Sequence, residues 1–203
     1  YYAEDWESVV KSSSMGLQRF PKDRSLLELR AISYWRLEDY DKSLADFKTK
    51  LAVAPTDSVN ALQCYASMGD LYHELGDTKN SYQAYEKALK IEENYTVVLN
   101  NYAYHISLAY PQPVKRVDKN LKKALEMSRK TIESEPDNAT YLDTYAWILH
   151  LCGMDIEAKA HFKHAMIYGG KESKVILEHY AIVLETLGEK ELANIYRNRA
   201  KSI

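Results

Sequence analysis

The sequence has few of the residues that interrupt regular structure. Its 203 residues include 7 glycines and 5 prolines, too few for the many tight turns of an all-β protein. No apolar run approaches the roughly 20 residues that span a bilayer. Two cysteines, Cys64 and Cys152, make neither a disulfide framework nor a zinc site. With 46% hydrophobic and 28% charged residues, the chain has the composition of an ordinary soluble protein.

The chain also lacks an excess of positive charge. Its formal net charge is −2, which argues against nucleic acid or an anionic membrane as the main target. The N-terminal stretch YYAEDWESVV has no feature of a signal peptide and does not begin with Met. We therefore expect a piece of a longer protein, whose location in cytoplasm or cell envelope depends on the missing N-terminus.

Small residues recur along the chain in two series. The first series is Ala31, Gly69, Ala103, Ala146 and Ala181, and the second is Ser43, Ser81, Ala124, Ala158 and Ala193. Taken in order, the members of the two series form five pairs. In four of these pairs the two residues are 12 positions apart. The third pair, Ala103 and Ala124, is separated by 21 residues, so that unit holds nine extra residues. Such self-similarity predicts a repeat protein.

Each repeat unit has the pattern of two amphipathic helices. Apolar residues recur three and four positions apart, as in the stretch TYLDTYAWILH at residues 140–150. Breakers or acids mark the turn inside a unit, and proline closes several units, as at Pro55 and Pro136. The Asp or Asn that follows such a proline is suited to cap the next helix.

These features resemble the tetratricopeptide repeat family, whose units are helix pairs of about 34 residues. The stretches NNYAY and YLDTYAW look like a tandem found in bacterial members. The resemblance implies an all-α, right-handed superhelix of about eleven helices forming a single domain, residues 1–203. We expect a trailing helix at 1–20 and repeats near 24–57, 62–95, 96–138 (with an insert at 110–119), 139–172 and 174–203. Lys50 and Arg197 depart from the pattern because they replace apolar residues of second helices.

No catalytic, metal or cofactor motif stands out against this helical pattern. His161 and His164 lie three residues apart, but no third ligand is near in sequence, so we predict no metal site. Phosphate-binding glycine loops and nucleophile motifs are absent. We therefore predict a protein that is not an enzyme and needs no cofactor.

The resemblance places the binding surface on the first helix of each pair, which lines the concave side of such a stack. Trp35, Tyr104 and Trp147 are expected there as peptide anchors, because they have no packing role at these positions. Asn100 and Asn101 are expected to bond a peptide backbone. The expected groove residues are Glu28, Trp35, Arg36, Asp70, His73, Asn100, Asn101, Tyr104, Asp143, Trp147, His150 and Glu178.

Acidic residues outnumber basic ones at the expected groove positions. Arg36 is the one permanent cation there, against six carboxylates: Glu28, Asp70, Glu74, Asp143, Glu178 and Glu185. This balance favours a protein or peptide partner that carries basic and apolar residues. The stretch from Lys115 to Lys130 is basic, and it is either a solvated loop and helix face or a contact for an acidic partner, a second copy or RNA.

Two functions remain open at this point. The first is a non-catalytic scaffold that binds a peptide or protein segment in its groove. The alternative is a structural spacer or oligomerisation arm of a larger protein, with a homodimer formed through the truncated N-terminal edge.

Overall fold

The computed structural model describes residues 5–110 and 116–203, and their regular structure is entirely helical. The described residues form eleven α-helices and no β-strand, so the expected all-α fold of helix pairs is confirmed. Residues 111–115, the centre of the expected insert, lie outside the described residues. Lys115, the first residue of the basic stretch, is one of them.

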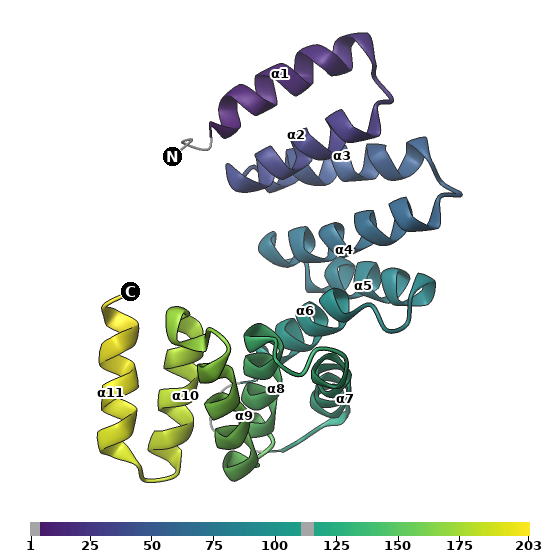
Figure 1. Ribbon diagram of the computed structural model, residues 1–203. Coiled ribbons are helices and arrows are strands. Elements are labelled where there is room, and N and C mark those ends of the chain that lie inside the picture. The colour runs from purple at the N-terminus through teal and green to yellow at the C-terminus, as the bar shows by residue number, and fades with distance from the viewer. Residues whose placement is uncertain (1–4, 111–115) are drawn as a thin grey trace. The chain divides into compact units, whose positions relative to one another are not determined.

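The chain divides into two compact units, Tyr1–Val98 and Leu99–Ile203. Unit 1 holds five complete helices (Figure 1): α1 (Trp6–Arg19), α2 (Arg24–Arg36), α3 (Tyr40–Val53), α4 (Ser58–Glu74) and α5 (Thr78–Ile91). Each packs against the next, in the order α1 to α5. The helix α6 (Thr96–Ser107) crosses the boundary between the units. Unit 2 continues with α7 (Lys119–Ser134), α8 (Ala139–Leu151), α9 (Asp155–Ile167), η1 (Gly170–Glu172), α10 (Lys174–Thr186) and α11 (Lys190–Lys201).

Acidic and amide side chains cap the helices that follow a proline. The Asp23 carboxylate accepts from the backbone N–H groups of Ser25 and Leu26 after Pro21. Asp57 caps α4 after Pro55 in the same manner, and Asn138 caps α8 after Pro136. Each cap satisfies N–H groups that have no partner inside their helix.

Tight turns join the two helices of a pair. Gly76, Gly153 and Gly188 adopt φ between 73° and 81°, in the left-handed region that glycine enters without steric cost. Glu38 occupies the corresponding turn between α2 and α3 with φ of 59°. The turn geometry is therefore kept even where the glycine is missing.

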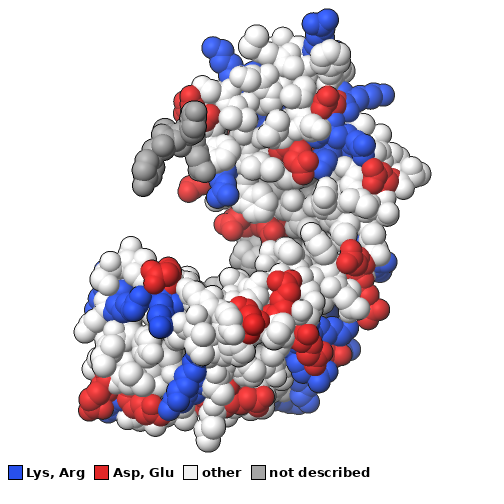
Figure 2. Space-filling view, in the orientation of Figure 1, with Lys and Arg blue, Asp and Glu red and all other residues white. Residues whose placement is uncertain are grey.

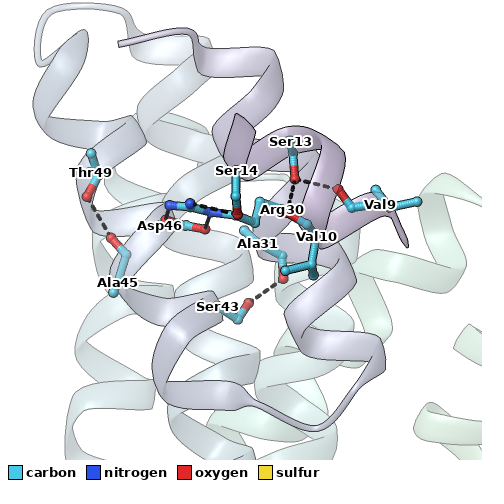
Figure 3. Close-up of polar contacts among 10 residues, drawn as sticks. All are labelled: Val9, Val10, Ser13, Ser14, Arg30, Ala31, Ser43, Ala45, Asp46 and Thr49. Atoms are coloured by element: carbon cyan, nitrogen blue, oxygen red, sulfur yellow. Dashed lines mark hydrogen bonds and ion pairs between the residues drawn. The ribbon is translucent and has the colours of Figure 1, made fainter. Parts of the chain in front are cut away.

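The core of unit 1 lies between α2, α3, α4 and α5. Ala31, Phe47 and Leu71 are buried in one cluster, and Trp35 packs partly against it. Arg30 of α2 makes two hydrogen bonds of 2.7 Å to the Asp46 carboxylate of α3, and it also reaches the Ser14 hydroxyl of α1 (Figure 3). Arg30 therefore links α2 to both α1 and α3, and these contacts hold the exposed face of α2 in place.

Candidate functional site

The exposed face of α2 lines a hollow of about 440 Å³ within unit 1, here called the α2 hollow. Its lining residues are Glu28, Ile32, Trp35 and Arg36 of α2, Phe47 of α3 and Ser67 of α4. Phe47 is buried beneath it, Trp35 is half-buried, and Ile32 is 38% exposed. Three of the expected groove residues, Glu28, Trp35 and Arg36, therefore lie together around an apolar floor.

Charges at the α2 hollow are more balanced than the sequence indicated. The Lys50 ammonium lies 3.1 Å from the Glu28 carboxylate, and the Lys50 side chain is only 5% exposed. The Arg36 guanidinium lies 5.9 Å from the centre of the Trp6 ring, and no carboxylate pairs with it among the described residues. Because Lys50 neutralises Glu28, Arg36 is left as a charge at this rim without an ionic partner in the part of the chain that the structure describes.

Asp70 and His73, the other groove residues expected in unit 1, are carried by α4 and do not line the α2 hollow. The Asp70 carboxylate accepts a short hydrogen bond from the Tyr85 hydroxyl of α5. Burial raises the pKa of Tyr85, and the negative charge of Asp70 raises it further. Asp70 therefore has a structural partner within its own helix pair. His73 is half-buried on the same helix.

A second hollow of about 270 Å³ lies within unit 2, here called the α8 pocket. Its lining residues are Asn100, Asn101 and Tyr104 of α6, Thr140, Asp143 and Thr144 of α8, and Ser173, Val175 and Ile176 at the start of α10. Four expected groove residues, Asn100, Asn101, Tyr104 and Asp143, are thus brought together. Burial raises the pKa of Tyr104, and the charge of Asp143 adds to that shift.

Trp147 lies against histidine rings and not in an open groove. The His179 ring of α10 stacks on it at 4.0 Å between centroids and 15° between planes. His179 Nδ1 also lies 2.9 Å from Asp143 Oδ1, while the His150 ring lies 5.3 Å from Trp147. Trp147 is 9% exposed, so the expectation that it has no packing role is not met. Helix α10 covers it, which the spacing within α8 does not reveal.

His150 and Glu178 complete the expected set. His150 makes a short contact with Asp155 at the start of α9, and its side chain is 10% exposed. Glu178 is exposed on α10, has no ion pair among the described residues, and does not line the α8 pocket. Neither residue is therefore placed at a hollow.

The expected excess of free carboxylates is reduced by partners from other helices. Glu28 pairs with Lys50, Asp143 with His179, and Asp70 with the Tyr85 hydroxyl. Glu185 of α10 pairs with Arg197 of α11. Lys50 and Arg197 are the two cations that replace apolar residues in second helices, and sequence reasoning noted them without assigning these partners. Across the face drawn in Figure 2, acidic and basic side chains are interspersed within each unit.

The part of the chain that the structure describes contains neither a cluster of metal ligands nor a helix suited to span a membrane. No group of three or more His, Cys, Asp or Glu side chains there is arranged to hold a metal ion. None of the described helices is both long enough and apolar enough to cross a bilayer.

Comparison with known proteins identifies the repeats. Residues 23–94, which include α2 to α5, match the tetratricopeptide repeat family model. No curated protein matches the chain significantly. Among solved structures, a tetratricopeptide repeat protein from Parabacteroides merdae ATCC 43184 is similar with a TM-score of 0.71 and 19% identity, over 97% of this chain and 72% of that one.

Two further solved structures share the fold. The pilF protein of Pseudomonas aeruginosa has a TM-score of 0.71 and 14% identity, over 88% of this chain and 75% of that one. A thermophilic TPR protein of Thermus thermophilus has a TM-score of 0.69 and 16% identity, over 87% of this chain and 89% of that one. Residues 23–94 thus match the tetratricopeptide repeat family by sequence, and the chain shares the fold of solved tetratricopeptide repeat proteins.

Proposed function

We propose that the chain is a non-catalytic scaffold that binds a segment of another protein on the exposed faces of its first helices. Stacked helix-pair repeats typically present extended binding surfaces of this kind. The observation that carries the proposal is the α2 hollow, where Ile32 and Trp35 offer apolar surface above buried Phe47. An apolar hollow with a polar rim is the common form of a site that receives an anchor side chain.

The expected groove residues keep unequal roles in this proposal. Trp35 provides the contact area for an apolar side chain of the partner, and Arg36 provides a charge at the rim that has no ion pair among the described residues. Glu28 orients Lys50 and contributes little charge of its own. Asn100, Asn101, Tyr104 and Asp143 form a second contact region within unit 2. Trp147 stacks on His179, whose ring also pairs with Asp143 of that region.

The proposal is tested by selecting peptides from a random library displayed on phage against the wild-type protein. Binding of a selected peptide is then measured by fluorescence anisotropy with Trp35→Ala and Ile32→Ala variants. We expect Trp35→Ala to weaken binding by about 2 kcal/mol, the scale of an interface hot spot. Ile156→Ala is the matched control, because Ile156 of α9 is 81% exposed and lines neither hollow.

Two results would contradict the proposal. Selected peptides that bind both groove variants as tightly as wild type would place the binding surface elsewhere. A selection that yields no peptide, together with concentration-dependent dimers in light scattering, would favour the oligomerisation arm instead.

A further inference from the structure

The α8 pocket contains a buried hydrogen-bond acceptor without a donor. Asn100 is 5% exposed, and its amide nitrogen donates to Asn101 Oδ1 at 3.3 Å. Its own Oδ1 has no hydrogen-bond partner among the described residues. A buried polar atom left without a partner costs free energy comparable to a lost hydrogen bond, so it calls for an explanation.

The same pocket holds a buried carboxylate that is only partly compensated. The Asp143 side chain is 7% exposed, and its partner among the described residues is His179, through Oδ1. Among the described residues, no lysine or arginine lines the α8 pocket. Burying a carboxylate without a full set of donors is costly, and a bound donor that carries positive charge would relieve this cost.

The pocket does not suit an anion, although it lies beside the starts of two helices. The Asn138 side chain accepts from the first-turn N–H groups of Thr140 and Tyr141 in α8. The Ser173 hydroxyl accepts from Ile176 N–H in α10. These caps use N–H groups that would otherwise attract an anion, and the charge of Asp143 repels one.

We propose that the α8 pocket binds the charged end of a lysine or arginine side chain from the bound segment. The Asp143 carboxylate and Asn100 Oδ1 accept its N–H groups, while Tyr104 and Val175 pack along its aliphatic stem. Asn100 Oδ1 is covered in the free protein, so binding includes a rotation about the soft terminal torsion of its amide. This inference rests on the proposed function, because it names the side chain that one region of the scaffold selects.

The test uses blocked amino acids as probes and the whole chain as the receptor. N-acetyl-lysine N-methylamide is titrated into ¹⁵N-labelled protein, and shifts of the Asn100 side-chain amide signals are followed by NMR. The norleucine analogue lacks the charge, and the glutamate analogue reverses it. We expect saturable shifts with the lysine probe and none with the other two.

Three variants sharpen the measurement. Asp143→Asn keeps the size of the side chain. It is expected to weaken binding of the lysine probe by about tenfold, because it removes a charge-assisted hydrogen bond. Glu191→Gln, an exposed carboxylate of α11 outside the pocket, is the matched control and is expected to change nothing. Val175→Asp adds a carboxylate at the exposed rim, within the first turn of α10, and is expected to strengthen binding several-fold.

The inference is overturned if the lysine probe causes no saturable shift at Asn100, or if Asp143→Asn binds it as wild type does. It is also overturned if the norleucine probe binds equally well, since the pocket would then be simply apolar. These results leave the peptide test at the α2 hollow untouched. The opposite outcome is also distinguishable. If the lysine probe binds but Trp35→Ala has no effect on selected peptides, the proposed function is contradicted, whereas the assignment of the α8 pocket as a lysine site stands.

Discussion

The Ser43 hydroxyl of α3 donates a 2.8 Å hydrogen bond to the backbone carbonyl oxygen of Ala31 in α2 (Figure 3). Ser81 of α5 repeats the contact with the Gly69 carbonyl oxygen of α4, also at 2.8 Å and also 12 residues apart. The repeated spacing of small residues is thus where the two helices of a pair touch. In unit 2 the corresponding second members are alanines, so the crossing there lacks this hydroxyl.

Ser43→Ala is expected to lower the free energy of unfolding by about 1 kcal/mol, the net value of one buried hydrogen bond. Urea unfolding followed by circular dichroism measures this change. Thr49→Ala is the control, because the Thr49 hydroxyl bonds to Ala45 within its own exposed helical turn and joins no second helix. An equal loss in both variants would mean that the contact between helices adds nothing.

Gly69→Ala is expected to destabilise unit 1 by about 1–3 kcal/mol through overpacking. A methyl group built at Gly69 would lie 2.3 Å from Cε1 of the fully buried Tyr85 ring, so the ring must shift. A Gly69→Ala, Tyr85→Leu double variant should lose part of this penalty, because the smaller side chain leaves room. Additive effects of the two changes in thermal unfolding would contradict the proposed clash.

The helix pairs were predictable from sequence because their signals are local. Apolar spacing, small residues 12 positions apart and prolines followed by Asp or Asn are all patterns within a single repeat or at its end. The structure shows them as packed helices and helix caps. The surroundings of the expected groove residues were not predictable, because they depend on residues far along the chain. His179 covers Trp147 from another repeat, and Lys50 reaches Glu28 from another helix. Lys50 and Arg197, cations at positions that are normally apolar, were the sequence signal for such contacts with another helix.

Trp147→Ala is expected to act on stability more than on binding. Its ring is buried and stacked on His179, so truncation should cost about 3–5 kcal/mol, as for other large buried aromatics. Trp35→Ala, at the open α2 hollow, should cost less stability and more affinity for a selected peptide. Chemical unfolding and anisotropy titrations of both variants measure the two effects. A stable Trp147→Ala protein that fails to bind would instead make Trp147 a direct anchor.

Because of His161, the free energy of unfolding is expected to fall as the pH drops below about 6.5, the ordinary pKa of histidine. Burial lowers the pKa of His161, whose ring packs edge-on against Tyr145 at 4.9 Å between centroids. The unfolded chain therefore takes up the proton first, so this contribution is complete above pH 6.5 and declines until the lowered pKa is reached. His161→Phe keeps a ring there and removes the titration.

The comparison between the two proteins isolates His161 from the other histidines. Between pH 7.5 and 5, we expect wild type to lose more unfolding free energy than His161→Phe loses. The other histidines are present in both proteins, so the difference between the two losses reports on replacement of the His161 ring. Equal losses in the two proteins would show that His161 titrates as it does in the unfolded chain.

The Lys50–Glu28 pair is expected to respond unequally to removal of its two members. Glu28→Gln leaves the ammonium of a 5% exposed side chain without its carboxylate, whereas Lys50→Met removes the buried charge and restores the apolar character of that position. Breaking one side of a buried pair is more costly than replacing the charge, so we expect a loss of about 1–3 kcal/mol for Glu28→Gln and about zero for Lys50→Met. Partial exposure of Glu28, at 40%, keeps the first value below that of a fully buried pair.

Urea unfolding of both variants and of the double variant measures this difference. Arg24→Met, which removes the exposed partner of Asp57, is the control. If Lys50→Met is the more damaging change, then the ammonium stabilises unit 1 through a contact other than Glu28. In Lys50→Met the Glu28 carboxylate also becomes an uncompensated negative charge at the α2 hollow, so an acidic peptide should bind this variant more weakly than wild type and a basic peptide more strongly.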